Sequence, residues 1–394
     1  MTAHLSLGPA RETVLSRASQ LPSEAVPLTD ALGRTLASGV TAPHNQPPFD
    51  NSAMDGFALR CAYTLGATTE NPVVLELVGE SRAGAPGAAV LGEGQATKIS
   101  TGAALPAGAD CVLRVEDASP AGEGRIALSQ ELPPGHDIRT AGTDVAIGTV
   151  VVAAGTLLGA GEIAMLASVG AASIECVRRP RVAILTTGDE LVAPGGELRH
   201  GQIFDSNSAM LDALVRECGG EVVALVAAVA DDPESTNRAV AALLGGDGAA
   251  PDVLICCGGV SVGEHDHVKD ALAAAGVTEH FWQVAMRPGH PTYFGERVAE
   301  NGGANTLVFG LPGNPVSSYA TFHMFAAPAL RALSGLIALK APIEAELAEP
   351  LSKPPGHTLV LRCTLTRSAG GVLTAAPTSA NQRSYVLSSL VGVD

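Results

Sequence analysis

Apolar residues follow two different patterns along the 394-residue chain. Between residues 181 and 331, short apolar runs typical of buried strands alternate with segments in which apolar residues recur at helical spacing. This alternation predicts βαβ units, and therefore a three-layer α/β domain with a mostly parallel, doubly wound sheet. Gly219 and Gly220 suit the end of one predicted helix, and Asp232 with Pro233 suits the start of the next.

The pattern changes on both sides of this region. Residues 46–145 contain short β-like runs divided by Gly and Pro turns, which predicts a small β-rich domain. The flanking segments 1–45 and 146–180 mix strand and helix patterns, so we expect them to form one mixed α/β linker domain that carries the β-rich domain as an insertion. Residues 28–36 place apolar side chains at helical spacing and predict a helix. Strand-like runs predict a small C-terminal β domain over 338–394.

Charge and cysteine content narrow the class of protein. Lys and Arg number 24 against 40 Asp and Glu, a net charge of −16, and no basic cluster stands out. This argues against a nucleic-acid partner or an anionic membrane surface. The seven cysteines are scattered without a C-x-x-C motif, which argues against a zinc ribbon or a disulfide framework and fits reduced cytoplasmic thiols.

The most apolar stretch, residues 145–174, is not expected to span a membrane. It carries one charge, Glu162, and glycines interrupt it before either half reaches the roughly 20 apolar residues of a span. We interpret it as a strand, a turn and a buried helix. The N-terminal residues lack the pattern of a signal peptide, so we expect a cytoplasmic protein.

Candidate chemistry gathers in four polar, glycine-containing loops that follow predicted strands: residues 187–190, 231–233, 258–266 and 310–314. In a parallel sheet, ligands bind beyond the carboxyl ends of the strands. The first three loops should therefore meet at one edge, and the fourth joins them if its strand is also parallel. Loop amides and helix N-termini suit a phosphate. The carboxylates Glu190, Asp231 and Asp266 suit a hard cation such as Mg²⁺, which would neutralise both these carboxylates and the phosphate.

Each of these features also has a purely structural alternative. The glycine loop is a strand-to-helix turn without the P-loop signature, and Asp266 can act as a helix cap. Asp232 is better suited to cap the helix that follows it than to bind a metal ion. His265 and His267 flank Asp266, but no Cys or further His follows at metal spacing. No G-x-S-x-G motif supports a covalent hydrolase.

Nine short motifs, read in order, resemble the MoeA family of molybdenum cofactor biosynthesis proteins and the E domain of gephyrin-type proteins. They cover residues 47–56, 100–110, 134–144, 179–182, 186–191, 205–207, 231–233, 258–266 and 311–317. The resemblance implies that residues 181–331 form a molybdopterin-binding domain. It also implies an elongated four-domain homodimer whose active cleft lies between this domain and the β-rich domain of the partner subunit.

The activity that the resemblance implies is Mg²⁺-dependent insertion of molybdenum from molybdate into adenylylated molybdopterin, with release of AMP. An upstream molybdopterin adenylyltransferase is a further possible partner. By position, the resemblance implies catalytic roles for Asp55, Thr101, Glu190, Asp231, Asp266 and Arg287, with Glu190, Asp231 and Asp266 holding the metal. The implied cofactor-binding residues are Asp144, Thr187, Gly188, Asp189, Ser206, Asn207, Gly258, Gly259, Ser261, Gly263, Pro312, Gly313, Asn314 and Ser384. The amides of Gly258, Gly259 and Gly263 are expected to contact phosphate.

The chain departs from the family pattern at three positions that commonly hold lysine: Gln283, Arg287 and His290. Arg287 can replace a lysine because its guanidinium binds oxyanions, whereas Gln283 supplies no charge. These changes suggest weaker binding of anions. A molybdopterin-binding carrier or scaffold without insertion activity is therefore the alternative function. A CinA-like nucleotide hydrolase is a third possibility, which the motifs at 52–56 and 100–102 oppose.

Overall fold

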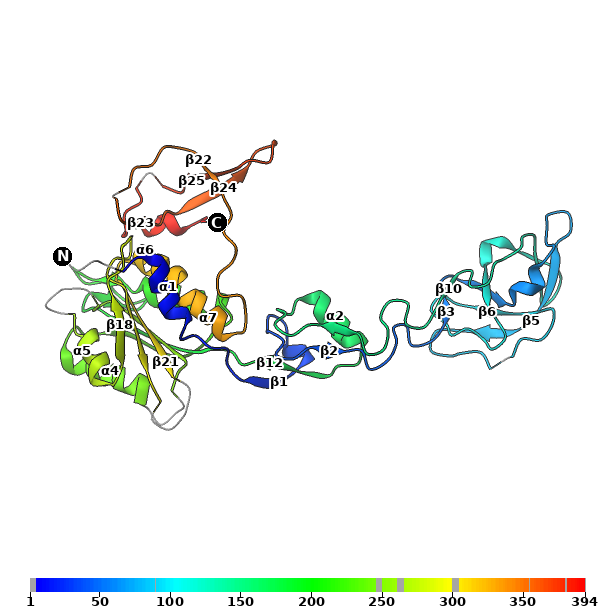
Figure 1. The fold of residues 1–394 in the computed structure, drawn as a ribbon, viewed down its shortest axis with the longest axis horizontal. Helices are drawn as coiled ribbons and strands as arrows, with labels where there is room; N and C mark the ends of the chain where they lie inside the picture. Colours follow the sequence, from blue (N-terminus) through cyan, green and yellow to red (C-terminus); the bar gives the residue numbers. More distant parts are fainter. Residues whose placement is uncertain are drawn as a thin grey trace. The chain divides into compact units, whose positions relative to one another are not determined.

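The computed structural model describes residues 5–88, 90–245, 250–260, 266–299, 305–353, 355–379 and 381–393. The chain forms two compact units (Figure 1). The first comprises Met1–Ala37, Gly155–Leu158 and Ile174–Asp394, and the second comprises Ser38–Ala154 and Gly159–Ser173. The finer division into four domains stays a prediction, and each unit is described by itself.

A six-stranded sheet is the centre of the first unit. Its strand order is β16-β13-β17-β21-β20-β18. The first four strands are parallel neighbours, whereas β20 runs antiparallel to both β21 and β18. The strands are β13 (Arg181–Thr187), β16 (Glu221–Val229), β17 (Val253–Cys257), β18 (Thr278–Trp282), β20 (Tyr293–Arg297) and β21 (Thr306–Leu311). Because β21 is parallel to β17, all four candidate loops leave the sheet at the same edge.

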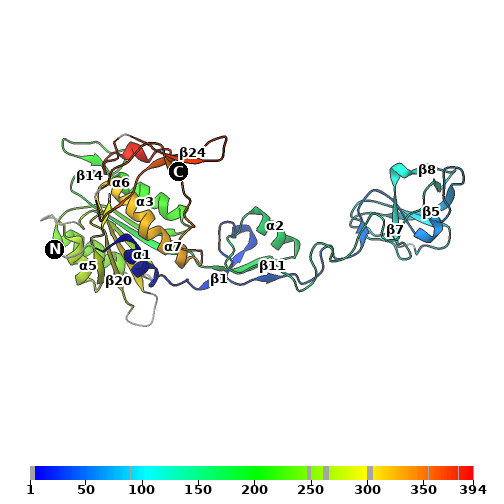
Figure 2. The ribbon, with the colours of Figure 1, turned by 45° about the horizontal axis from the view of Figure 1, so that its top comes forward.

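Helices cover both faces of this sheet, which makes three layers (Figures 1 and 2). One face carries α1 (Leu7–Leu15), α3 (Ser206–Glu217), α6 (Pro315–Thr321) and α7 (Ala327–Leu333). The other carries α4 (Pro233–Gly245) and α5 (Val268–Ala274). The alternation along β13 explains the two cores: Val182 and Ile184 belong to the α3 side, and Ala183 and Leu185 to the α4 side.

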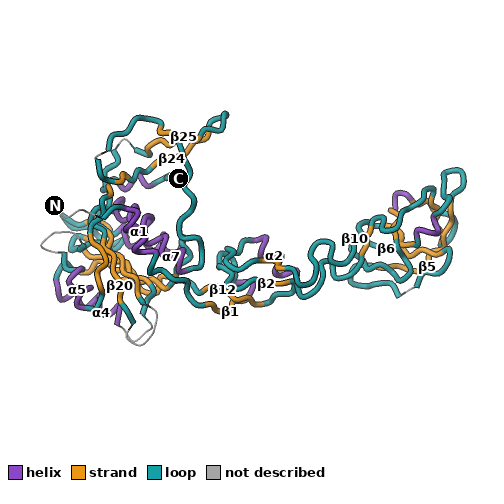
Figure 3. The backbone as a smooth tube through the Cα atoms, in the orientation of Figure 1, coloured by secondary structure: helices purple, strands orange, loops and turns teal. Residues whose placement is uncertain are grey.

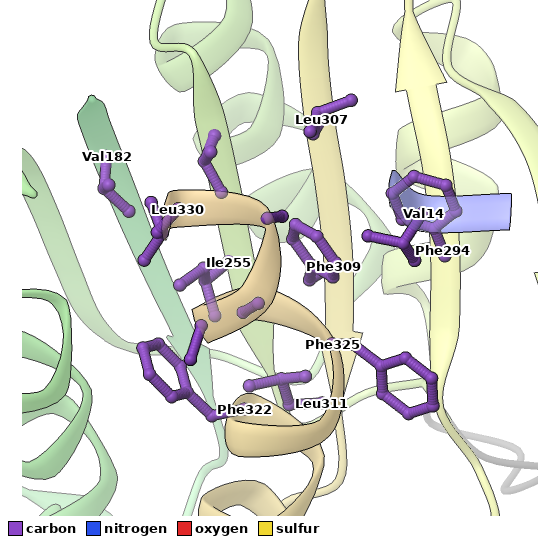
Figure 4. Close-up of a cluster of buried hydrophobic side chains, with 14 of the residues drawn as sticks. Val14, Val182, Ile255, Phe294, Leu307, Phe309, Leu311, Phe322, Phe325 and Leu330 are labelled. Carbon is purple, nitrogen blue, oxygen red and sulfur yellow. The ribbon is translucent and has the colours of Figure 1, made fainter. Parts of the chain in front are cut away.

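Aromatic side chains fill the larger of these cores. Phe309 on β21 packs among Phe322, Phe325 and Leu330 of the covering helix segment (Figure 4). We expect one long helix from the sequence here, but Phe322–Ala326 form a π-helical turn between α6 and α7. Pro328 has no N–H for the carbonyl four residues earlier, and a wider turn relieves this conflict.

The helix predicted over residues 28–36 is wrong. Only Leu28–Asp30 form a short 3-10 turn, and Leu32 is 64% exposed. Gly33 has φ +71°, a left-handed conformation that ends the turn, and its amide donates to the carbonyl of Leu158. Nearby, β1 (Ser23–Pro27) pairs with β12 (Ser173–Val177).

The second unit is β-rich (Figure 3). Its main sheet has the order β7-β4-β6-β5-β9-β8. These strands are β4 (Gly56–Leu59), β5 (Val73–Ser81), β6 (Gln95–Ile99), β7 (Cys111–Arg114), β8 (Ala118–Pro120) and β9 (Arg125–Leu128). Buried Leu59, Leu75, Leu113 and Leu128 form its core. The 3-10 turns Cys61–Thr64 and Val115–Asp117 connect strands.

Two small ladders accompany this sheet. In one, β2 (Val40–Thr41) pairs with β11 (Val150–Val152), and in the other β3 (Asn51–Ser52) pairs with β10 (Ile138–Arg139). The strand, turn and helix predicted in residues 145–174 are present as β11 and α2 (Ala160–Ser168). The prediction that this helix is buried is wrong, because Leu166 is the one buried residue of α2. No helix among the described residues has the length and apolar character needed to cross a membrane.

The C-terminal segment has its own small sheet in the order β22-β25-β24. Its strands are β22 (Glu346–Leu347), β24 (Cys363–Arg367) and β25 (Leu373–Pro377), followed by the 3-10 turn Leu387–Leu390. This segment is joined to the α/β part where β23 (Thr358–Leu359) pairs in parallel with β19 (Met286–Arg287). A further short pair, β14 (Leu191–Val192) and β15 (Ile203–Phe204), follows the first candidate loop.

Candidate functional site

Hydrogen bonds join the loops at the carboxyl edge of the parallel strands. The amide of Gly188 donates to the carbonyl of Val229 at 3.0 Å, and the amide of Asp231 donates to the carboxylate of Asp189 at 3.1 Å. The amide of Gly258 donates to the carbonyl of Leu311 at 3.1 Å. The loops after β13, β16, β17 and β21 therefore form one continuous surface.

Glycines let the backbone of these loops approach closely. Gly258 has φ +94°, and a Cβ there would lie 2.8 Å from the carbonyl oxygen of Thr187. Gly259 has φ +63°, and its Cβ would lie 2.7 Å from Val268. The Gly258 amide donates to Leu311 in this structure, so its expected contact with phosphate stays a prediction. Gly258 contributes by having no side chain.

Two buried polar atoms at this edge lack a partner among the described residues: Thr187 Oγ1 and Asn207 Oδ1. Asn207 donates through Nδ2 to the carbonyl of Gly313 at 2.7 Å, which fixes the amide and leaves its oxygen unsatisfied. Buried polar atoms normally have partners, so two unsatisfied oxygens at the same edge of the sheet are consistent with a site for a polar ligand. The neighbouring Ser206 is the first residue of α3, which Asp205 caps through the amide of Ser208.

The carboxylates at this edge are not assembled in advance. Glu190 is exposed, and Asp231 and Asp266 are half-buried. Among the residues that the structure describes, no group of three or more His, Cys, Asp or Glu side chains is arranged to hold a metal ion. Any cation bound here therefore needs further oxygen ligands, which a phosphate and water would supply.

Two of the structural alternatives are decided by the caps of the helices. Asp232 accepts the amide of Ser235 at 2.8 Å and so caps α4, and this hydrogen bond lowers the pKa of the Asp232 carboxyl. The N-cap position of α5 is His267, so Asp266 does not occupy it. The predicted Ser261 and Gly263, and also His265, lie outside the described residues.

A pocket of ≈ 630 Å³ lies between the α/β part and the C-terminal segment. Four cationic or titratable nitrogen side chains line it, and no Asp or Glu does among the residues that the structure describes: Arg287, His290, His357 and Arg383. Asn314, Ser317, Gln382 and Ser384 add neutral polar groups. The amide of Val316 donates to the carbonyl of Ser384 at 3.1 Å, which ties the C-terminal segment to the start of α6. In a chain of net charge −16, an acid-free pocket with two arginines favours an anionic ligand.

The loop after β21 belongs to both regions. Pro312 and Asn314 line the cationic pocket, whereas Gly313 accepts the Asn207 amide. A Cβ on Gly313 would lie 3.7 Å from the Cα of Gly258. The structure thus brings the predicted Arg287, Pro312, Asn314 and Ser384 to the pocket, and connects them through this loop to the glycine-rich edge.

In the second unit, Asp55 and Thr101 are neighbours. The amide of Thr101 donates to the Asp55 carboxylate at 2.8 Å, and both residues are exposed. Asp144 is also exposed, and its amide donates to the carbonyl of Gln46. No hydrogen bond found among the described residues joins Asp144 to the Asp55–Thr101 pair.

Comparison with known families covers almost the whole chain. Residues 5–170 match the MoeA N-terminal region (domain I and II), and residues 183–332 match a probable molybdopterin binding domain. Molybdopterin molybdenumtransferase 2 of Mycobacterium tuberculosis is 39% identical over 370 residues, covering 92% of this chain and 88% of that protein. This chain belongs to the MoeA family. The molybdopterin molybdenumtransferase of Bacillus subtilis is 35% identical, over 93% of this chain and 83% of the relative.

The fold agrees with this assignment to MoeA. A solved molybdopterin biosynthesis MoeA protein from Pyrococcus horikoshii superposes with a TM-score of 0.77 at 30% identity, covering 99% of this chain and 93% of that one. A second structure of the MoeA protein from the same organism gives a TM-score of 0.78 at 28% identity. The order of the elements described above is therefore the MoeA order.

Sequence reasoning missed five polar pocket residues of this MoeA chain: Ser317, His357, Gln382, Arg383 and Tyr385. Arg383 directly precedes the predicted Ser384, and a basic residue beside a predicted ligand residue was the available signal. Nothing in the sequence around His357 indicated a binding residue. It reaches the pocket through the pairing of β23 with β19, which the sequence does not reveal.

Proposed function

We propose that this protein is a molybdopterin molybdenumtransferase, which inserts molybdenum from molybdate into adenylylated molybdopterin and releases AMP. The curated relatives carry this name over most of their length. One observation carries the proposal beyond that likeness: the 312–314 loop connects an acid-free cationic pocket to an edge with orphaned polar oxygens. Such a pair of sites suits a reaction that brings a free oxyanion to a phosphate-linked substrate.

The pocket would receive molybdate. Arg287 and Arg383 each present a fork of N–H donors that matches two oxygens of a tetrahedral oxyanion. Ser317 and Ser384 add hydroxyl donors that can follow the oxyanion as its bonds change. Because Gln283 supplies no charge, the fixed positive charge in this region comes from Arg287 and Arg383.

The edge of the sheet would hold the phosphate side of the adenylylated substrate. Thr187 and Asn207 have unsatisfied oxygens there, and Gly258 and Gly259 let the backbone after β17 pack closely against Thr187 and Val268 beside them. Glu190, Asp231 and Asp266 would hold Mg²⁺ together with phosphate oxygens, and this all-oxygen donor set fits that ion. The bound ion would neutralise the charge that develops on the AMP leaving group.

The protein would act as a homodimer. Asp55 and Thr101 form an exposed, hydrogen-bonded pair, and we propose that this pair completes the site of the partner subunit. The hydrogen bond from the Thr101 amide fixes one carboxylate oxygen of Asp55 and leaves the other oxygen available to a ligand.

The test is release of AMP by the purified protein from adenylylated molybdopterin, with Mg²⁺ and increasing molybdate. We expect release to require molybdate, and we expect Arg287→Gln and Arg383→Gln each to raise the molybdate needed for half-maximal rate by about tenfold, since each removes a charge-assisted hydrogen bond. Arg367→Gln, on β24 and outside the pocket, is the control and should behave like wild type.

Two results would contradict the proposal. AMP release that ignores molybdate would indicate a simple hydrolase. Tight binding of the pterin with no AMP release at any molybdate concentration would support the carrier or scaffold function, which the names of the relatives do not favour.

A further inference from the structure

We infer that Trp282, the single tryptophan of the chain, is a positioning residue that holds both flanks of the glycine loop after β17. Its indole Nε1 donates to the carbonyl of Val260 at 2.9 Å. Val260 directly follows Gly258 and Gly259 and is 1% exposed. Trp282 therefore fixes the point at which the described part of the loop leaves β17.

The same indole also holds the far flank of the loop. Lys269, the second residue of α5, places its Nζ 3.5 Å from the centre of the Trp282 ring. A cation over an indole face is attracted by the ring quadrupole. Glu279, on the same strand as Trp282, accepts this ammonium group at 3.3 Å. Asp266, a proposed metal ligand, lies three residues before Lys269. The contacts of Lys269 with Trp282 and Glu279 therefore also restrict the position of Asp266.

Sheet topology makes this arrangement unusual. Trp282 ends β18, which is the edge strand, and two strands separate β18 from β17. The link is possible because Val260 crosses over β21 at Gly310, where a Cβ would lie 2.8 Å from the Val260 side chain. Gly310 and Trp282 together seat Val260, one by leaving space and the other by donating a hydrogen bond.

A structural explanation is that a half-buried indole N–H needs some acceptor. It does not account for the lysine, since a cation on α5 is not needed to satisfy an indole. Both flanks converge on one ring, and their described residues Gly258, Gly259 and Asp266 belong to the proposed phosphate edge. The inference thus rests on the proposed function, and it names Trp282 as the residue that holds the described residues of the phosphate edge in position.

The deciding variant is Trp282→Phe, which keeps an aromatic face for Lys269 and removes the N–H. We expect kcat/KM for adenylylated molybdopterin to fall about tenfold, because one hydrogen bond that orders the site is lost. The molybdate concentration for half-maximal rate should not change, since the cationic pocket does not touch Trp282. Tyr293→Phe is the matched control: it removes one hydroxyl from the residue paired with Trp282 and leaves the Val260 bond intact.

A second readout uses wild-type protein and the emission of its one tryptophan. Titration with AMP in the presence of Mg²⁺ should shift this emission, because the indole is hydrogen-bonded to Val260 directly after Gly258 and Gly259. Lys269→Met keeps the fluorophore and removes the cation, and we expect it to weaken Mg²⁺–AMP binding severalfold. If Trp282→Phe lowers the unfolding temperature, Lys269→Met decides the question.

The inference is overturned if both variants match wild type in kcat/KM and in Mg²⁺–AMP affinity while wild type releases AMP. Loss of the molybdate response and the substrate response together would also overturn it, because a general disturbance would then explain the effect. Failure of the wild-type protein to release AMP contradicts the proposed function instead, and with it the inference that rests on that function.

Discussion

His323 is a half-buried residue with a buried Nε2 atom and has no use in the proposed reaction. It lies in the π-helical turn, with its ring centre 4.4 Å from that of Tyr319, and its Nε2 has no partner among the described residues. Burial lowers the pKa of the His323 imidazole, and the nearby Glu217 opposes this shift. The neutral imidazole is therefore the form that folding favours.

The consequence for stability follows from the sign of this shift. An unfolded histidine takes up a proton near pH 6.5, whereas folded His323 does so at lower pH. Between these values the unfolded state binds more protons, so the unfolding free energy falls as pH falls, by up to about 1.4 kcal/mol per pH unit. We expect His323→Phe to lose this component. Urea unfolding at pH 7.5 and 5.5 measures it, with the exposed His44→Gln as control. An equal pH dependence in wild type and His323→Phe would contradict the assignment.

Sequence reasoning predicted which side chains meet at the carboxyl edge of the parallel strands, and the structure shows their positions, whereas their roles in binding stay predictions. Thr187, Asn207 and Asn314 follow strands or open helices, and a parallel sheet delivers such positions to one edge whatever their distance in sequence. The hydrogen bond from the Gly258 amide to Leu311 was not predicted, because a glycine pattern does not reveal whether an N–H is bonded to a neighbouring strand.

Among the elements, the strands and helices of the α/β part were predictable from the sequence. Each buries its apolar residues in one of the two cores of the sheet, which gives a clear periodic pattern. The segment over 28–36 was not, since four apolar residues at helical spacing outweighed one glycine, and Gly33 decides the local structure. The π-helical turn was missed for a related reason. Apolar periodicity continues through Phe322–Ala326, and only Pro328 indicated a conflict.

The start of β17 depends on a buried ion pair. The Asp252 carboxylate is 5% exposed, accepts two N–H groups of Arg178 at 2.8 and 2.9 Å, and also accepts the amide of Arg181. Removing one partner of a buried pair leaves an uncompensated charge, so we expect Asp252→Ala to lower the unfolding free energy by about 3 kcal/mol.

A matched pair elsewhere isolates the effect of burial. Asp212 accepts Arg216 with the same two-bond geometry, both distances being 2.9 Å, but Arg216 is 62% exposed. Asp212→Ala should cost less than about 1 kcal/mol. Similar losses for Asp252→Ala and Asp212→Ala in denaturant titrations would show that burial does not set the strength of these pairs.

The chain contains two compact units with separate cores, so its unfolding should not be two-state. Leu113 is fully buried in the β-rich unit, and Leu254 is fully buried in the α/β unit. We expect Leu113→Ala and Leu254→Ala each to lower the stability of their own unit by about 2 to 5 kcal/mol. Differential scanning calorimetry should show each substitution moving one transition and leaving the other in place. A single transition that both variants shift equally would contradict this.

The isolated antiparallel bridge between Gln46 and Val145 has a consequence for how such a chain can evolve. Gln46 and Val145 exchange backbone hydrogen bonds, at 2.7 and 3.1 Å, so the 47–144 segment leaves and returns through adjacent residues. Closing the Gln46–Val145 bridge costs little more conformational entropy for a long, self-folding segment than for a short turn. A genetic exchange between the codons of these two residues would replace the entire β-rich part in one event. The β2–β11 pairing outside this segment would stay as it is. The α/β part would then be linked to a different domain without a change in its own sequence.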